Sequence, residues 1–530
     1  MFRRTLIAAL PLVLLLAVPI LLKPRETVAP KTGADKLVMV TPHNEPVRAE
    51  FAAAFEKYYR EHYGREVQVD YRTVGGTSDI VRYLADQYEA AFRHAWEKAG
   101  NKWTPEIAAG YSNPRPSPSA EVRRARRMFL ESNVGIGIDV FWGGGVYDHN
   151  KQAVRGFAVD GGVQKRHPEY FKPEIIPERF GGDVFYDRQG RFYGACLASF
   201  GICYNPDRVA AMTPNTPPDT WRSLGEGRFF DTLAVADPTK SGSANKCYEA
   251  ILQQCMQEAA ARLGNEPAGV AAGWIEGFSL IKRIVANARL VSDGASQVPR
   301  EVSSGNAAAG MAIDTYGLSE QQWSEEIQGQ PSIRYLPPRG GSAISADPVQ
   351  ILRGAPNRQA AEAFVDFLLS AEGQQLWDYR AGTPGGPVKY ALRRPPIRRD
   401  LYTPGHLRYF SDPDYDPYKA GASFVYHAAW TGPAFNLIRV LVKCTALDPQ
   451  IELREAWQAI LQAGGPEKVP EAMREFDAFP VPYADIRRAA AGLAVNEKNP
   501  LIAVVRLQRS WSESAIRHYR RAAELARQGK

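Results

Sequence analysis

The sequence predicts an α/β protein with a largely parallel sheet, followed by a mostly helical C-terminal part. Three successive apolar segments, at 37–40, 67–71 and 136–141, each end in a polar or glycine-containing loop before a helical pattern begins. This repeat is typical of parallel sheets, whose ligands bind beyond the carboxyl ends of the strands. A long apolar stretch at 193–204 predicts a further strand that passes from one part of the fold to another.

The composition is that of a globular protein of several compact units. The chain has 530 residues, of which 45% are hydrophobic and 23% are charged, so extended disorder and collagen are excluded. Lysine and arginine number 65 against 58 acidic residues, a net charge of +7. Over so long a chain this excess predicts only weak attraction to anionic surfaces, and nucleic acid is not expected as a partner.

The N-terminal residues 1–23 predict export from the cytoplasm. Arg3 and Arg4 precede an apolar run from Leu6 to Leu22 that is interrupted by Pro11 and Pro19. Basic residues before an apolar run are typical of a secretory signal peptide, although a retained anchor has a similar pattern. We therefore expect a periplasmic protein, either released by cleavage or tethered to the inner membrane.

In the first part of the chain, the first strand is followed by a helical pattern at 47–62, and the second by a helix that restarts near Ile80. Residues 88–132 are more polar and predict a surface insertion, with a loop at 113–119 and a basic helix at 123–127. That helix lacks interleaved aromatic residues, so we interpret its arginines as a solvated face.

Further along, the pattern alternates again between apolar strands, polar loops and helices. The remainder, from about residue 394, is mostly helical with proline-rich joints. The segments before it comprise strands at 233–236, 290–291, 309–316 and 347–352, a polar loop at 237–245, and helices after 245, at 274–284 and at 359–369.

Six short motifs occur together between Lys36 and Arg394. They are VTPHNEP (40–46), DVFWGGG (139–145), GICYNPDRV (201–209), TWRSL (220–224), ADPTKSGSANK (236–246) and AAEAFVDFLLSAEGQQLW (360–377). In this order they resemble the extracellular solute-binding proteins (family 1) of bacterial ABC importers, in the branch of the ferric-iron-binding periplasmic proteins.

The resemblance implies a two-lobed periplasmic-binding-protein fold (type II) with hinge strands and a ligand cleft. Residues 36–198 and 345–394 would form lobe 1, residues 199–344 lobe 2, and residues 395–530 a helical C-terminal extension.

It also implies transport: a monomer that captures a solute and delivers it to an ABC permease in the inner membrane. An alternative with the same fold is a ligand-sensing subunit of a membrane signalling system. An enzyme is not expected, because the sequence contains no G-x-S-x-G, H-E-x-x-H or G-x-x-x-x-G-K-[ST] motif and its eight histidines are scattered.

Candidate ligand-binding residues lie in the loops that follow the predicted strands. Ser241-Gly242-Ser243 opens a helix, where free N–H groups favour an anion, although Ser241 could equally be a plain N-cap. Trp142 could cover a ligand or pack in the core. The full set is His43, Asn44, Glu45, Gly76, Thr77, Trp142, Gly143, Gly144, Thr239, Ser241, Gly242, Ser243, Ser296, Thr315 and Tyr316.

The resemblance implies two metal ligands, His43 and Tyr316, for ferric iron as the transported ligand. Imidazole and phenolate suit this ion, but Thr315 stands where the relatives have a second tyrosine, and Gly143–Gly145 replace an acidic ligand. Glu45, Asp314 or Asp347 could compensate. We therefore favour an organic or phosphorylated anion bound without metal, with ferric iron as the alternative; no resident cofactor is expected.

The five cysteines are an odd number, so at least one stays reduced or pairs between molecules. Cys196 and Cys203 are too far apart along a strand to form a disulfide, as are Cys247 and Cys255 along a helix. Pairing between distant segments stays open.

Overall fold

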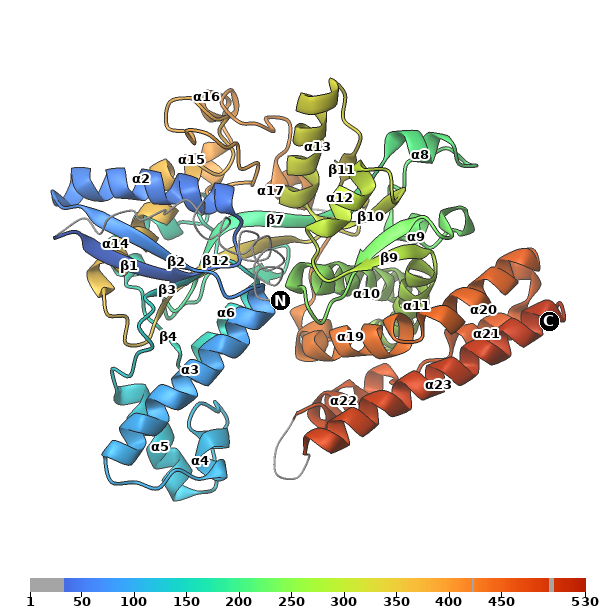
Figure 1. Ribbon diagram of the computed structural model, residues 1–530, viewed down its shortest axis with the longest axis horizontal. Coiled ribbons are helices and arrows are strands. Elements are labelled where there is room, and N and C mark those ends of the chain that lie inside the picture. The colour runs from blue at the N-terminus through green and yellow to red at the C-terminus, as the bar shows by residue number, and fades with distance from the viewer. Residues whose placement is uncertain (1–32, 422–423, 495–499) are drawn as a thin grey trace, which may run out of the picture.

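The fold is described from a computed structural model (Figure 1), which describes residues 33–421, 424–494 and 500–530. The predicted signal peptide or anchor, residues 1–23, lies outside these ranges. Within them, no helix combines the length and apolar character needed to cross a membrane.

Lobe 1 is built on a sheet in which β1 (Asp35–Val40) lies between β2 (Val67–Arg72) and β3 (Val140–Trp142), both parallel to it. β12 (Ile344–Leu352) extends the sheet antiparallel to β3, and β4 (Ala158–Val159) pairs with β12. The helices of this lobe include α2 (Glu45–Tyr63), α3 (Thr77–Lys98), α6 (Val146–Arg155), α7 (Val163–Arg166), α14 (Arg358–Leu369) and α15 (Ala371–Gln375).

Lobe 2 continues the same sheet through β7 (Tyr193–Tyr204), which pairs with β12 from Tyr193 to Ser199 and with β10 from Phe200 to Tyr204. The order beyond β7 is β10 (Ala309–Ile313), β8 (Leu233–Ala236) and β9 (Ala288–Ser292), with β11 (Arg334–Leu336) also on β7. Its helices are α8 (Pro206–Ala210), α9 (Trp221–Leu224), α10 (Gly242–Leu263), α11 (Glu266–Ala286), α12 (Gln297–Ser303) and α13 (Asp314–Gln328).

This arrangement confirms the expected fold class: a mixed α/β protein of two lobes joined by long crossover strands, with further helices at the C-terminal end. β7 and β12 are buried along nearly their whole length. β7 is an almost continuous apolar run, as expected for a strand buried on both faces, whereas β12 also buries Ser345, Asp347 and Gln350.

Two strands differ in their bounds from the predicted ones: one begins later and the other ends earlier. The segment 136–141 is a ladder strand only from Val140, because Gly137 has a φ of +73° that interrupts the extended backbone. The segment 309–316 ends as a strand at Ile313 and turns into α13, because the Asp314 carboxylate accepts the N–H groups of Ser199 and Thr315. Tyr316 therefore lies in the first turn of a helix.

The surface insertion of lobe 1 has a small core of its own. The C-terminal half of α3 packs with α4 (Pro105–Gly110) and α5 (Ala120–Glu131) at the lower left of Figure 1. Phe92, Trp96, Tyr111 and Phe129 fill the space between these helices.

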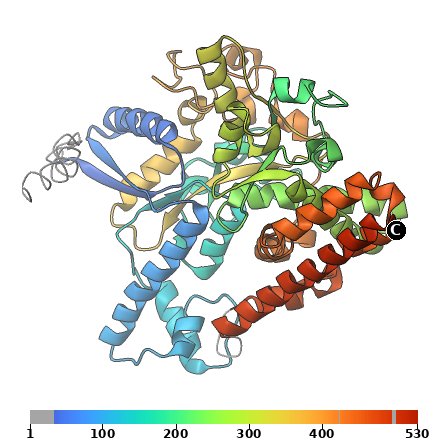
Figure 2. The same ribbon diagram turned by 45° about the vertical axis from the view of Figure 1, so that its right-hand side comes forward.

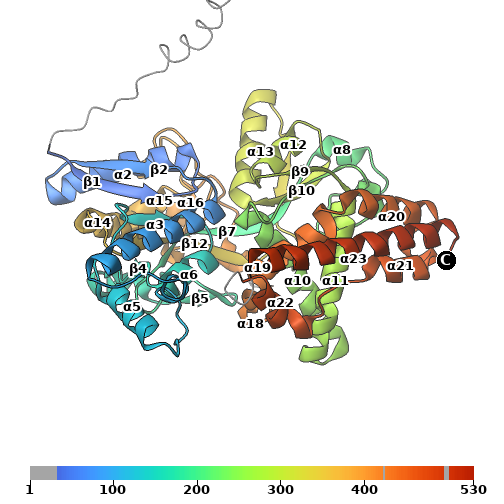
Figure 3. The same cartoon turned by 60° about the horizontal axis from the view of Figure 1, so that its bottom comes forward.

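The predicted helical extension, 395–530, is divided between the two lobes. Its first part, with η3 (Arg399–Leu401), α16 (Pro404–Leu407) and α17 (Pro417–Ala420), is irregular and packs on lobe 1 through Ile397 and Tyr418. The rest packs on lobe 2, and Figure 3 shows α19 beside α10. It comprises α18 (Ala428–Thr431), α19 (Phe435–Val442), the π-helix η6 (Lys443–Leu447), α20 (Gln450–Gln462), α21 (Pro470–Asp477), α22 (Ile486–Gly492) and α23 (Leu501–Arg527).

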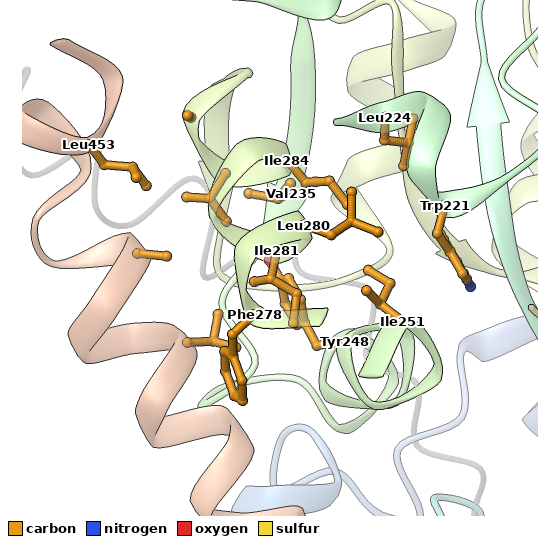
Figure 4. Packing of buried hydrophobic residues seen from close by; sticks show 14 of the residues in the cluster. Trp221, Leu224, Val235, Tyr248, Ile251, Phe278, Leu280, Ile281, Ile284 and Leu453 are labelled. Atoms are coloured by element: carbon orange, nitrogen blue, oxygen red, sulfur yellow. The ribbon is translucent and has the colours of Figure 1, made fainter. Parts of the chain in front are cut away.

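These C-terminal helices share one hydrophobic core with lobe 2. Figure 2 shows α20, α21 and α23 packed together at the side of this lobe. Leu453 of α20 belongs to the same buried cluster as Ile281 and Ile284 of α11 (Figure 4). The extension is thus part of the lobe 2 core and not an appendage on a linker.

All five cysteines, Cys196, Cys203, Cys247, Cys255 and Cys444, are buried and free. Burial raises the pKa of the Cys203 thiol to about 12, so it behaves as a small apolar group.

Candidate functional site

A cavity of about 750 Å³ lies between the lobes, next to the crossover strands. Lobe 1 contributes the loops before α2, α3 and α6, the hairpin of β5 (Arg179–Phe180) and β6 (Asp183–Val184), and part of β12. Lobe 2 contributes β7 and the first turns of α10 and α13, and residues 426–435 complete the wall. This size suits a small organic molecule.

Five helices of the two lobes, outside the C-terminal extension, begin at the wall of this cavity. Lining residues occupy the N-terminal ends of α2, α3, α6, α10 and α13; they are Asn44, Thr77, Gly145, Val146, Gly242, Ser243, Thr315 and Tyr316. The first N–H groups of a helix have no partner within it, and the helix dipole places partial positive charge there. The arrangement therefore favours a negatively charged ligand.

An ion pair forms the floor of the cavity. Arg394 Nη2 lies 2.6 Å from Asp347 Oδ2, and the two side chains are only 3% and 9% exposed. Arg394 Nε and Asp347 Oδ1 have no hydrogen-bond partner within the part of the chain that the structure describes. Buried polar atoms are normally paired, so these two atoms are exceptions, and both belong to residues that line the cavity.

His43 lies close to this floor as a neutral imidazole. Burial lowers its pKa to about 4, and the nearby Asp347 offsets this effect only in part. The ring packs edge-on against Trp142, with 4.5 Å between ring centroids. Its Nε2 is buried and has no partner among the described residues.

The two expected metal ligands do not belong to a ready-made metal site. Burial raises the pKa of Tyr316, which opposes the phenolate form that binds ferric iron. Among the residues that the structure describes, no three His, Cys, Asp or Glu side chains are grouped to hold a metal ion.

Eight of the fifteen predicted ligand-binding residues line the cavity. They are His43, Asn44, Thr77, Gly144, Gly242, Ser243, Thr315 and Tyr316. They come from segments far apart in the sequence, which the two lobes bring together around the cavity.

The other seven predicted ligand-binding residues do not line the cavity. They are Glu45, Gly76, Trp142, Gly143, Thr239, Ser241 and Ser296. Trp142 is fully buried in the lobe 1 core, where it packs on Phe51. The Ser241 hydroxyl accepts the Ala244 N–H at 3.3 Å and so caps α10, and the Thr239 hydroxyl donates to Asp237 within its own turn.

Gly143 packs directly against the His43 ring: a Cβ atom added at Gly143 would lie 2.7 Å from His43 Nε2. Gly76 and Glu45 lie next to lining residues at the starts of α3 and α2, and Ser296 precedes α12.

Several lining residues were not predicted as ligand-binding. Arg394 and Asp347 form the floor, Lys246 lies one turn into α10, and Tyr426 and Phe435 belong to the C-terminal extension. Asp347 was considered only as a substitute metal ligand. For the others the signal was weak, because a single lysine, arginine or aromatic residue has no distinctive local pattern.

Comparison with known proteins supports the expected class. Residues 197–380 match the family model of the bacterial extracellular solute-binding proteins. The curated phosphoglycerate transport regulatory protein PgtC of Salmonella typhimurium is 25% identical over 182 residues, which are 34% of this chain and 39% of that protein. An uncharacterized protein of Haemophilus influenzae is 24% identical over 237 residues, 44% of this chain and 59% of that protein. The chain thus spans less than two thirds of the length of these relatives.

Among solved structures, the periplasmic binding protein P5PA has a TM-score of 0.47 and 16% identity, covering 80% of this chain and 98% of its own. AfuA of Actinobacillus pleuropneumoniae, solved with fructose-6-phosphate, has a TM-score of 0.45 and 20% identity, covering 73% and 94%.

The structure therefore has two lobes with a cavity between them. Residues 197–380 carry the sequence pattern of the bacterial extracellular solute-binding proteins, as the motifs predicted.

Proposed function

We propose that this protein is the solute-binding component of an ABC import system, which captures a small organic anion between its lobes and delivers it to a permease in the inner membrane. The observation that carries the proposal is the convergence of five helix N-termini on a cavity of about 750 Å³. The curated relative PgtC is named for phosphoglycerate transport regulation, which is consistent with an anionic solute.

The charged side chains around the cavity do not oppose this choice. Arg394 pairs with Asp347 on the floor, and Arg188 pairs with Glu178 at 2.8 Å on the β5 side. The lining also includes Arg179 and Lys246 and the carboxylates of Asp148, Asp183 and Asp187. Side-chain charge of neither sign dominates, so the helix ends favour an anion. The volume favours an organic anion over a bare ion, which would leave most of the space unfilled.

The sensing role stays the second candidate, because PgtC is named a regulatory protein. A protein that is tethered to the inner membrane by its N-terminal segment would suit this role, and one that is released into the periplasm would suit transport.

Titration calorimetry of the exported protein tests the proposal with 3-phosphoglycerate, citrate, inorganic phosphate and the cation spermidine. We expect a 1:1 complex with at least one organic anion, tighter than with inorganic phosphate. Scattering should show a change in the radius of gyration on binding, because two lobes close on a ligand by a hinge motion. Preference for spermidine over every anion would contradict the proposal.

Ferric iron is tested separately by colour. Mixing the protein with ferric citrate should give no visible phenolate-to-iron band, because Tyr316 is buried as a neutral phenol and the described residues provide too few oxygen ligands. Absorbance spectra of the wild type and of Tyr316→Phe should coincide. A coloured wild-type complex that Tyr316→Phe abolishes would restore the iron-carrier function.

Alanine substitutions of Ser241 and Ser243 distinguish a helix-capping role from a role in ligand binding. Ser241→Ala should lower the free energy of unfolding by about 1 kcal/mol and leave ligand affinity unchanged, because Ser241 caps α10 and does not line the cavity. Ser243→Ala should do the reverse and weaken the anion found by calorimetry several-fold. Loss of affinity in Ser241→Ala alone would show that the cap also contacts the ligand.

A further inference from the structure

The C-terminal wall, residues 424–435, closes one side of the cavity. Its lining residues are Tyr426, Ala428, Gly432, Pro433 and Phe435. The wall is attached to both lobes: the Tyr426 N–H donates to the Gly181 carbonyl in lobe 1 at 2.6 Å. The Asn245 side chain of lobe 2 donates to the Phe435 carbonyl at 2.9 Å.

Lys246 is the lobe 2 cation at this wall. Its Nζ lies 2.8 Å from Glu249 Oε2 and 4.0 Å from the centre of the Tyr426 ring. Burial alone would lower the pKa of Lys246, but Glu249, Tyr426 and Asp183 together outweigh burial and raise the pKa above its ordinary value. Lys246 therefore remains an ammonium group, with N–H donors beyond the one that Glu249 accepts.

Glu249 is held in turn by the C-terminal wall. Its side chain is 1% exposed, and its Oε1 accepts the Tyr426 hydroxyl at 2.8 Å and the Thr431 hydroxyl at 2.6 Å. Both carboxylate oxygens are thus occupied, which fixes the position of the carboxylate and, through it, that of the ammonium group.

Asp183 is the other carboxylate near Lys246 on the cavity wall. It already accepts the Ser345 hydroxyl at 2.7 Å and the Val184 N–H at 3.1 Å. No ion pair joins it to Lys246 among the described residues, so the ammonium group keeps donors for the cavity.

We propose that the C-terminal wall is a working part of the ligand site: Tyr426 and Thr431 position Glu249, Glu249 positions Lys246, and Lys246 donates from lobe 2 to the oxygen atoms of the anionic ligand. This inference rests on the proposed function, because it names a cation and three positioning residues for the same cavity. It assigns a part in ligand recognition to the C-terminal extension.

Tyr426→Phe tests the positioning step, because it keeps the ring beside Lys246 and removes only the hydroxyl that Glu249 accepts. With 3-phosphoglycerate or citrate, whichever the wild type binds more tightly, we expect Kd to rise 3- to 10-fold. Tyr519→Phe is the matched control: it removes a hydroxyl of the same extension that donates to the Thr445 carbonyl, outside the wall, and does not line the cavity. Its Kd should stay within twofold of the wild type.

Lys246→Gln tests the ligand contact itself. Kd should rise at least 10-fold, and the dependence of log Kd on log ionic strength should become weaker, because one cationic contact is lost. A purely structural role would not change that slope. A Kd within twofold of the wild type for both Lys246→Gln and Tyr426→Phe would overturn the inference and leave the proposed function standing, whereas a wild type that binds no anion would overturn both.

Discussion

Replacing Arg394 by methionine is expected to lower the free energy of unfolding by about 3 to 5 kcal/mol, because Asp347 would be left as an unpaired buried charge. The two side chains are 3% and 9% exposed and lie 2.6 Å apart, on a strand and a segment that meet only in the folded protein. Arg394 also lowers the pKa of Asp314, which burial alone raises. Urea denaturation at neutral pH measures the loss.

The surface pair Arg339 and Asp219 provides the control. Its side chains are 77% and 55% exposed at a similar separation of 2.7 Å, so Arg339→Met should cost less than about 1 kcal/mol. The double variant Arg394→Met with Asp347→Asn should recover part of the stability but not the ligand affinity. If Arg394→Met and the wild type have the same urea midpoint of unfolding, water reaches the pair and the floor is not buried as described.

Most of the sheet could be predicted from hydrophobic pattern alone. The predicted strand 193–204 coincides with β7, and 233–236 with β8, because strands buried on both faces form continuous apolar runs. The predictions failed at strand ends that depend on distant partners. Asp314 turns the chain into α13 by accepting the Ser199 N–H, a contact across 115 residues that no local pattern reveals.

Site residues could be predicted where an apolar strand, a polar loop and the start of a helix follow one another in the sequence. Thr77, Gly242 and Ser243 follow this pattern and line the cavity. Lys246 and Arg394 do not follow it: a lysine one turn into a helix and an arginine in an irregular segment are ordinary surface residues in sequence. Their burial depends on Glu249 and Asp347, with which they pair only after folding.

The C-terminal extension was predicted as helical, but its place in the fold could not be derived from its own pattern. An amphipathic helix such as α20 shows which face is apolar but not what covers it. The structure covers that face with α11 of lobe 2. Tyr426, which belongs to the same extension, lines the cavity.

Trp457→Ala is the second substitution with a large expected effect, and it tests whether the extension and lobe 2 unfold together. The Trp457 side chain is 1% exposed, and its Nε1 donates to Asn287 Oδ1 at 2.9 Å. The Asn287 amide in turn donates to the Leu224 and Glu226 carbonyls of lobe 2. Removing the indole should cost about 3 to 5 kcal/mol through the cavity it leaves, and it would also leave the Asn287 oxygen without its donor.

Hydrogen exchange measured by mass spectrometry distinguishes one cooperative unit from two. In Trp457→Ala, protection should fall in α10 and α11 of lobe 2 as much as in α20 and α23, because these helices share a single core. Trp323 on α13 is the matched control: it is 56% exposed, so Trp323→Ala should change stability by less than about 0.5 kcal/mol. Faster exchange confined to α20 and α23, with α10 and α11 unchanged, would show that these helices unfold separately from lobe 2.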